Sequence, residues 1–321
     1  MKTRDLVDVY TMMLKIRLFE ERIVEVYPAQ EMKTPVHLCI GQEAIAAGVC
    51  HYLFKEDFVF TNHRCHGHAL AKGVEMLPIM AELYGKKAGC CGGKGGSMHL
   101  SDPERGIMAT SAIVGGGIAL AVGAGLTLSL KDSRGIAVAF FGDGATDEGI
   151  FYESLNFAAL KKLPVLFVCE NNFYATNSPL SARQPLDNIY RKGEVFGIKG
   201  FRCNGNDARQ VLKISGSLIA KIRGGSGAFL LECRTYRWKG HVGPDCDVEN
   251  GCRPRYELNA WQKKCPLRIL ESHLLKKKIL SKREAGVLRD RLRNEILEAE
   301  KTAKEMPYPG KEEAGCGVYA C

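Results

Sequence analysis

The sequence has no apolar run long enough to cross a membrane. Its longest run, Ile118 to Leu130, contains Gly123 and Gly125 and falls short of the ~20 residues that a membrane-spanning helix needs. We therefore expect a buried helix there and no membrane partner. Residues 1–22 likewise lack the continuous apolar core of a secretory signal peptide, which predicts a cytoplasmic protein.

Paired cysteine spacing is also missing. None of the 13 cysteines forms a CxxC motif, the spacing typical of structural zinc sites and thioredoxin-like redox sites. Cys90 and Cys91 are adjacent, and Cys316 and Cys321 lie on a C-terminal tail. We expect reduced thiols without a metal or redox role.

Positive charge is not concentrated in one segment. The net charge is +9, but Lys and Arg are interleaved with acidic residues, apart from the short run Lys276–Lys278. Because nucleic-acid-binding domains carry a basic patch or stripe, we interpret the charge as a solvated surface or as attraction for an anionic small ligand, and expect no nucleic acid. A length of 321 residues and a hydrophobic content of 45% are typical of a globular enzyme.

The sequence does contain an alternation of short β-rich runs and helical patterns. The runs 136–141, 165–170 and 229–234 are separated by helical segments, of which 149–162 is the clearest. Before them, apolar residues at three- and four-residue intervals predict a long helix over residues 3–27. This order favours an α/β fold with a parallel sheet flanked by helices and with helical extensions at both ends.

After Trp261 the pattern becomes helical and charged, and it predicts an amphipathic helix that ends near Pro307. The apolar face of this helix is expected at Leu288, Leu292, Ile296 and Leu297. We expect one domain over residues 1–305, with its C-terminal helices starting at about residue 262. The tail, 306–321, should be loosely ordered unless a partner holds it.

Two predicted strands end directly in polar motifs. GDGATDEG follows the first run at 142–149, and NNFYA follows the second at 171–175. Ligands of open parallel sheets bind beyond the carboxyl ends of the strands. Asp143 and Asn172 can meet there and offer two oxygen ligands to a hard cation, which Mg²⁺ usually shares with phosphate oxygens. A tight turn is the alternative interpretation of GDG alone.

Two glycine-rich segments fail as nucleotide motifs. GGKGGS at 92–97 lacks the GxxxxGK[ST] spacing of a phosphate-binding loop, and VGGGIALAVG at 114–123 lacks the GxGxxG order of a dinucleotide fingerprint. We expect the first to be a loop near the entrance of the active site. The glycines of the second are expected to allow close packing of a helix.

The motifs together resemble a known family, the α subunits of the thiamine-diphosphate-dependent decarboxylase component of 2-oxo-acid dehydrogenase complexes, of the pyruvate, branched-chain and acetoin types. The resemblance covers roughly Leu6 to Trp261. Its segments occur in the family's order and are HLCIGQEA at 37–44, HRCHGH at 63–68, GGKGGSMHL at 92–100, IVGGGIALAVG at 113–123, FFGDGA at 140–145, ESLNFAALKKLPVLFVCENNFYA at 153–175 and TYRWKGH at 235–241.

The resemblance implies a thiamine diphosphate site with Mg²⁺. Its metal ligands would be Asp143, Asn172 and the backbone carbonyl of Tyr174. The diphosphate would meet the amides of Gly144 and Ala145 and the planar guanidinium of Arg64, which suits phosphate oxygens.

The same resemblance assigns the rest of the site. Ala112 and Val114 match the backbone that grips the aminopyrimidine, although the family often has Gly at position 112. His241 matches a histidine that faces the thiazolium and assists proton or acyl transfer, for which a neutral imidazole is suited. His37 matches a residue near the carboxylate of a 2-oxo acid. His63 stands where many pyruvate enzymes have Tyr, and this form looks more like the acetoin type.

The implied enzyme is incomplete in this chain. In the family, a β subunit supplies the glutamate that activates the aminopyrimidine, within an α2β2 assembly, and a lipoyl-bearing acyltransferase accepts the acyl unit. We interpret Glu43, in GQEA, as structural or interfacial and not as that glutamate. The loop after His241 has no serine, so control by phosphorylation there is not expected.

The substrate stays open between pyruvate, acetoin and a branched-chain 2-oxo acid. Two other functions are also open. One is an α/β pair that transfers a two-carbon acyl unit to a sugar or another biosynthetic acceptor. The other is a non-catalytic scaffold with the same fold.

Overall fold

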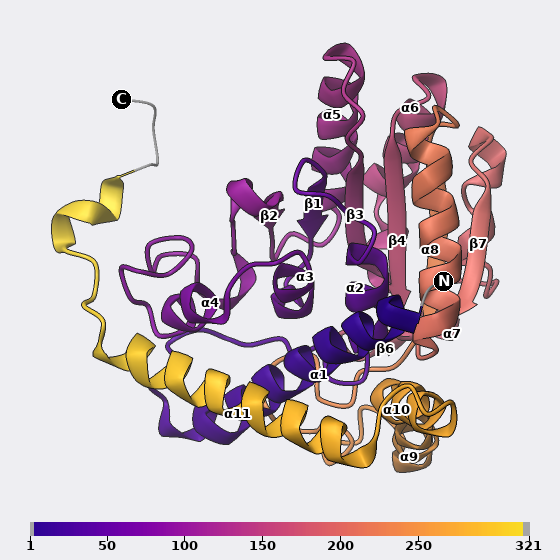
Figure 1. The fold of residues 1–321 in the computed structure, drawn as a ribbon. Coiled ribbons are helices and arrows are strands. Elements are labelled where there is room, and N and C mark those ends of the chain that lie inside the picture. The colour runs from indigo at the N-terminus through magenta and orange to yellow at the C-terminus, as the bar shows by residue number, and fades with distance from the viewer. Residues whose placement is uncertain (1–2, 317–321) are drawn as a thin grey trace.

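The computed structural model describes residues 3–316 of the chain (Figure 1). Within them, six parallel strands form one sheet in the order β2-β1-β3-β4-β8-β7. The strands are β1 (Phe58–Thr61), β2 (Ile107–Thr110), β3 (Ala137–Gly142), β4 (Val165–Asn171), β7 (Gly200–Asn204) and β8 (Phe229–Arg234). The parallel sheet and three of its strands are therefore confirmed, and β1, β2 and β7 are additions.

Helices cover both faces of the sheet, as a parallel sheet requires. Because side chains alternate along a strand, Ala137, Ala139 and Phe141 of β3 face one core, with α5 (Gly116–Leu130) and α6 (Gly149–Leu160). Val138 and Phe140 face the other core, with α1 (Thr3–Val26), α2 (Glu43–Cys50) and α8 (Ala208–Arg223).

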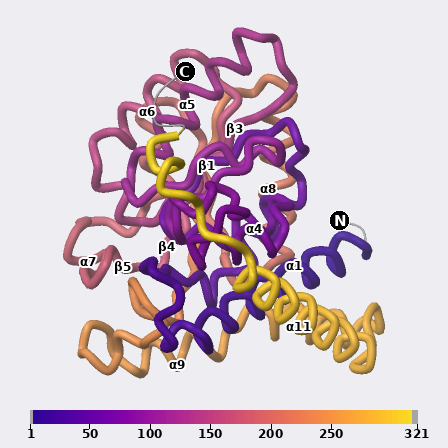
Figure 2. The backbone as a smooth tube through the Cα atoms, turned by 90° about the vertical axis from the view of Figure 1, so that its left-hand side faces the viewer, coloured from indigo at the N-terminus to yellow at the C-terminus, as the bar shows by residue number. Residues whose placement is uncertain are grey.

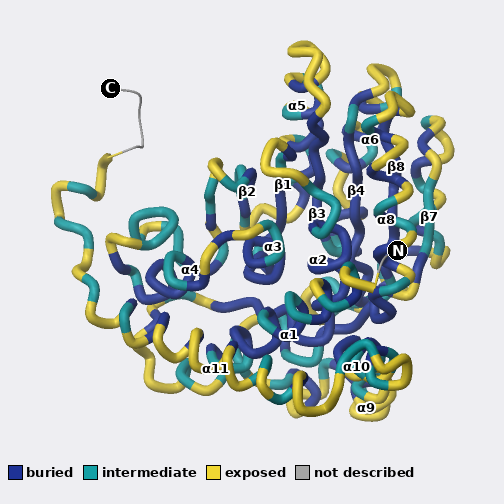
Figure 3. The backbone as a smooth tube through the Cα atoms, in the orientation of Figure 1, coloured by how far each residue is buried: buried dark blue, intermediate teal, exposed yellow. Residues whose placement is uncertain are grey.

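The α5 helix forms as predicted, but only one side of it is buried. Leu120 is 51% exposed and Leu130 is 79% exposed, and Figure 3 shows the outer part of α5 as exposed. The prediction of a buried helix is therefore wrong for the outer face of α5. The inner face of α5 covers the sheet, and nothing in residues 3–316 lies over the outer face.

The other α-helices are α3 (His66–Ala71), α4 (Met76–Leu83), α7 (Leu180–Arg183), α9 (Arg255–Lys263), α10 (Pro266–Lys276) and α11 (Lys282–Glu305). Figure 1 shows α9, α10 and α11 below the sheet, while α3 packs on α1 and α2, and α4 packs on α11. Figure 2 shows α11 beside α1, with the C-terminal segment passing α4. Every helix in this described part of the chain is too short or too polar to cross a membrane.

The C-terminal region differs from expectation in three respects. Helix begins at Arg255, not near residue 262. Leu288, Leu292 and Ile296 pack on the core, but Leu297 is exposed, so it was wrongly placed on the apolar face. The tail is held by the chain itself up to residue 316, because Lys87 contacts Glu313 at 2.7 Å. Cys321 lies outside the described residues.

Candidate functional site

The two polar motifs meet at the carboxyl edge of the sheet. Strands β3 and β4 pair in parallel with Gly142 opposite Glu170, so Asp143 and Asn172, which follow these strands, emerge from neighbouring tips. Both side chains are buried, and both line one pocket. The convergence expected from the sequence is therefore present.

Most of the expected cofactor residues line this pocket. Those that do are His63, Arg64, Val114, Asp143, Gly144, Ala145, Asn172, Tyr174 and His241. Ala112 is exposed and is not among the lining residues. His37 lies behind them, with its ring 4.5 Å from that of His63. A wider hollow between α8 and α10 is lined by none of the motif residues.

The Asp143 carboxylate is arranged as a cation ligand. Its Oδ2 accepts a hydrogen bond from Arg183, whereas its Oδ1 is buried without a partner. Burial raises the pKa of this carboxyl, and the Arg183 guanidinium opposes the shift. The chain has other buried carboxylate oxygens without a partner, on Glu20 and Glu43, but Asp143 is the one that lines the pocket, where a hard cation could bind its free oxygen.

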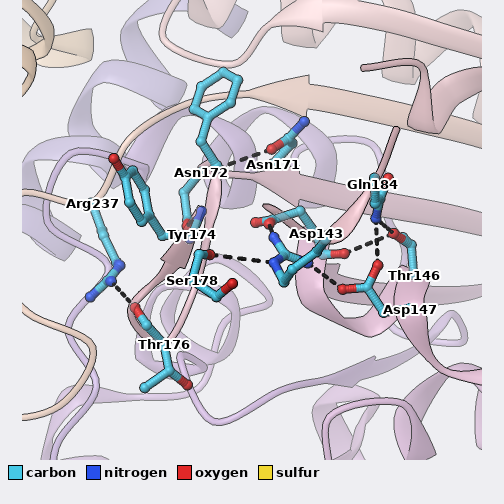
Figure 4. Close-up of polar contacts among 12 residues, drawn as sticks. Asp143, Thr146, Asp147, Asn171, Asn172, Tyr174, Thr176, Ser178, Gln184 and Arg237 are labelled. Atoms are coloured by element: carbon cyan, nitrogen blue, oxygen red, sulfur yellow. Dashed lines mark hydrogen bonds and ion pairs between the residues drawn. The ribbon is translucent and has the colours of Figure 1, made fainter. Parts of the chain in front are cut away.

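The two asparagines have different roles. Asn171 fixes the turn after β4: its Oδ1 accepts the Phe173 N–H at 3.0 Å, and its Nδ2 donates to Glu232 at 2.8 Å. Asn172 faces the pocket, where its Nδ2 donates to Gln42 and its Oδ1 accepts the Tyr174 N–H, both at 3.2 Å. An amide oxygen has two lone pairs, so Asn172 Oδ1 retains capacity for a metal. Figure 4 shows Asn172 and Tyr174 near Asp143.

The turn after β3 approaches the next segment closely. A Cβ atom on Gly144 would lie 2.7 Å from the Cβ of Ala175, a contact that a larger residue could not make without moving one segment. Glycine at this position therefore keeps the GDG turn against the segment that carries Tyr174. Gly144 and Ala145 also line the pocket, where their backbone amides could face an anion.

Arg64 supplies positive charge inside the site. Its Nη1 donates to the Leu38 carbonyl at 2.6 Å and its Nη2 to the His241 carbonyl at 3.3 Å. Burial lowers the pKa of the guanidinium, and the nearby Glu170 carboxylate opposes the shift. The two carbonyls hold Arg64 in the wall of the pocket.

Three histidines gather beside Arg64. The His241 ring lies 5.1 Å from both the His37 and the His63 rings. Burial, reinforced by the Arg64 guanidinium, lowers the pKa of His37 to about 3, of His63 to about 2 and of His241 to about 4. All three imidazoles are therefore neutral near pH 7, the form suited to general-base work or to hydrogen bonding with a substrate.

Two motif segments lie outside the pocket. Glu82 accepts hydrogen bonds from the amides of Cys91, Gly93, Gly95 and Gly96, so the GGKGGS loop is wrapped around a carboxylate. None of its residues lines the pocket, and its expected place near the active-site entrance is not supported. Glu43 binds Arg17 at 2.6 Å, which fits its structural interpretation.

Several pocket residues were missed by sequence reasoning. Gln42 and Glu170 could have been found, because both are polar and lie inside the motif segments 37–44 and 153–175. Asn62 and Thr176 carry no chemical signal of their own. Arg183 does not line the pocket but binds Asp143, and it was missed because it reaches Asp143 only through the fold.

Comparison with known proteins agrees with this geometry. The family model for the dehydrogenase E1 component matches residues 10–312. The α subunit of acetoin:2,6-dichlorophenolindophenol oxidoreductase from Bacillus subtilis is 37% identical, over 97% of this chain and 92% of its own length. The corresponding subunit from Cupriavidus necator is 36% identical, over 98% of this chain and 94% of its own length. The α subunit of the pyruvate dehydrogenase E1 component of Porphyra purpurea is 35% identical, over 97% of this chain and 92% of its own. The chain therefore belongs to the dehydrogenase E1 component family, as an α subunit of a thiamine-diphosphate-dependent oxidoreductase of the 2-oxo-acid dehydrogenase type.

Proposed function

We propose that this chain binds Mg²⁺ and thiamine diphosphate in the pocket at the tips of β3 and β4. Asp143, Asn172 and the Tyr174 carbonyl would hold the metal, and Arg64 with the Gly144 and Ala145 amides would hold the diphosphate. When bound, the cofactor supplies the electron sink for cleavage beside a carbonyl. The observation that carries the proposal is the buried Asp143 Oδ1, which has no partner in the protein.

The substrate would be a 2-oxo acid such as pyruvate, or acetoin, and its acyl unit would pass to a lipoyl partner. His241 would move a proton at the reacting centre, and this role is supported by its neutral imidazole in the lining of the pocket. His37 and His63 would contact the substrate beside it. The named relatives include both acetoin and pyruvate enzymes, and His63 favours the acetoin type.

The active site would be completed by a β subunit in an α2β2 assembly. Val114, which would grip the aminopyrimidine through its backbone, is 38% exposed, and its neighbour Ile113 is 73% exposed. These apolar side chains stand at the edge of the pocket, where a second chain could cover them and supply the missing glutamate. We also propose a single cofactor-binding domain, with its C-terminal helices from Arg255 onward.

Calorimetry tests the cofactor site. The full chain should bind thiamine diphosphate only with Mg²⁺, and Asp143→Ala should abolish this binding. If the chain is a non-catalytic scaffold, neither the wild type nor Asp143→Ala should bind thiamine diphosphate, with or without Mg²⁺. Normal binding by Asp143→Ala would show that the ligand assignment is wrong.

Reconstitution tests the reaction. The isolated chain should show little decarboxylation, and added β subunit should restore it. Robust turnover by the isolated chain would reject the need for a partner. Assays with a lipoyl domain and with sugar acceptors would separate the proposed oxidoreductase from a biosynthetic acyl transferase.

A further inference from the structure

Arg183, at the end of α7 (Leu180–Arg183), is held by three acceptors. Its Nη2 donates to Asp143 Oδ2, its Nη1 donates to Asp147 Oδ2, and its Nε donates to the Ser178 carbonyl at 3.3 Å. The planar fork of a guanidinium presents its donors to two carboxylates in a fixed geometry, whereas an ammonium group is a compact charge on a flexible stem. Arg183 therefore fixes one face of the Asp143 carboxylate.

The ion pair does not neutralise the metal site. Asp147 balances the charge of Arg183, so the three side chains together keep one negative charge. The hydrogen bond to Arg183 uses only Asp143 Oδ2, and Oδ1 stays buried without a partner. Arg183 is not among the residues that line the pocket. Its position is that of a support behind the carboxylate.

Gln184 holds the same turn from the next position. Its Nε2 donates to Thr146 Oγ1 at 2.7 Å and to Asp147 Oδ1 at 2.6 Å. The Thr146 hydroxyl in turn donates to the Asp143 carbonyl at 2.8 Å. Figure 4 shows Gln184, Thr146 and Asp147 grouped beside Asp143. The turn that carries Asp143 is thus fixed through its backbone as well as its side chain.

The chain between residues 174 and 184 connects both parts of the metal site. Its first residues, Tyr174 and Ala175, line the pocket, and Ala175 packs on Gly144. Its last residues, Arg183 and Gln184, bind the turn of residues 143–147. One short segment therefore presents a metal-ligand carbonyl at one end and holds the metal-ligand carboxylate at the other.

We propose that Arg183 is a positioning residue of the metal site, which holds Asp143 by Oδ2 so that Oδ1 faces the cation. The proposal rests on the proposed role of Asp143 as an Mg²⁺ ligand. It opposes the alternative that Arg183 competes with the metal for Asp143. The two ideas predict changes of opposite sign: removal of a support weakens Mg²⁺ binding, and removal of a competitor strengthens it.

The test is Mg²⁺ titration of the full chain at fixed thiamine diphosphate, followed by calorimetry. Arg183→Met removes the charge and the fork but keeps much of the stem, and Arg183→Lys keeps the charge without the fork. Arg191→Met is the matched control, because Arg191 is exposed, does not line the pocket and lies over the Tyr190 ring. Thermal unfolding of each variant without ligands measures any structural effect separately.

Arg183→Met should bind Mg²⁺ roughly tenfold more weakly or worse, the scale of one charge-assisted hydrogen bond. Arg183→Lys should lie between Arg183→Met and the wild type, and Arg191→Met should match the wild type. If Arg183→Met does not fold, Arg183→Lys decides the question. Unchanged or tighter Mg²⁺ binding by a folded Arg183 variant overturns the proposal, even if its unfolding temperature falls. Where the Arg183 variants bind Mg²⁺ normally, Asp143→Ala separates two explanations. Normal Mg²⁺ binding by Asp143→Ala would show that the proposed metal site is wrong, whereas loss of binding would show that only the proposed role of Arg183 is wrong.

Discussion

Asp143→Asn separates the binding role of Asp143 from its structural role. The substitution keeps the shape of the side chain and removes its charge. Loss of one partner of a buried charge pair costs about 3–5 kcal/mol. Mg²⁺–thiamine diphosphate should therefore bind roughly 10²- to 10⁴-fold more weakly, since about 1.4 kcal/mol corresponds to a factor of ten.

The stability of the ligand-free chain should change much less. Arg183 keeps Asp147 as an ion-pair partner after the substitution, so no guanidinium is left unpaired. Removal of the charge also relieves the desolvation that raises the pKa of Asp143. We expect the free energy of unfolding to change by about 1 kcal/mol, the net value of an ordinary hydrogen bond.

Two measurements check this reasoning. Calorimetry gives the affinity for thiamine diphosphate with Mg²⁺, and urea unfolding without ligands gives the stability. Asp187→Asn is the control, because Asp187 is exposed and pairs with Arg202 and Arg234 outside the pocket; it should bind cofactor normally. Near-normal binding by Asp143→Asn, or a loss of stability above about 3 kcal/mol, would show that Asp143 serves the fold and not the metal.

Three further predictions concern the histidines and a helix. His241→Ala should leave cofactor affinity unchanged and slow the reconstituted reaction roughly 10²- to 10⁴-fold; weaker cofactor binding in calorimetry would contradict its assignment to the chemical step. The pKa of His63 is about 2 in the folded chain and about 6.5 in the unfolded chain. At pH 5 the unfolded chain therefore binds more protons at this residue. The stability that neutral His63 allows is complete above about pH 7 and is lost as the pH falls. His63→Phe should therefore lose less stability than wild type between pH 7 and pH 5 in urea unfolding, and an equal loss would reject the shift. Gly286→Ala, at a position in α11 where an added Cβ meets no atom within 4 Å, should raise the free energy of unfolding by about 0.5–1 kcal/mol without a change in cofactor affinity, and a decrease would contradict the open space found there.

The strands found from sequence and those missed differ in a physical way. The β3 and β4 runs, AVAFFG and VLFVCEN, are almost wholly apolar because helices cover both of their faces. By contrast, β1 and β2 have four residues each, and β7 is GFRCN, a partly exposed edge strand that starts with glycine. Short or edge strands lack the burial that makes a pattern visible.

The same distinction applies to the site. Asp143 and Asn172 could be predicted because each directly follows a recognisable strand, and parallel strands bring their carboxyl ends to one edge. Arg183 is the last residue of a four-residue helix and reaches Asp143 across 40 positions of sequence. No local pattern reports such a contact, because it depends on the path of the whole intervening segment.

The partial exposure of α5 links the sequence to the proposed assembly. The helix is apolar on all sides, a composition typical of a helix buried on every side, yet Leu120 and Leu130 are exposed, as is Leu160 on the adjoining α6. Exposed apolar side chains that form a large contiguous patch mark a surface that another protein covers. Ile113, just before α5 at the edge of the pocket, is exposed in the same way. Burial of this surface by the proposed β subunit would account for the composition of α5 and would place a second chain beside the cofactor pocket.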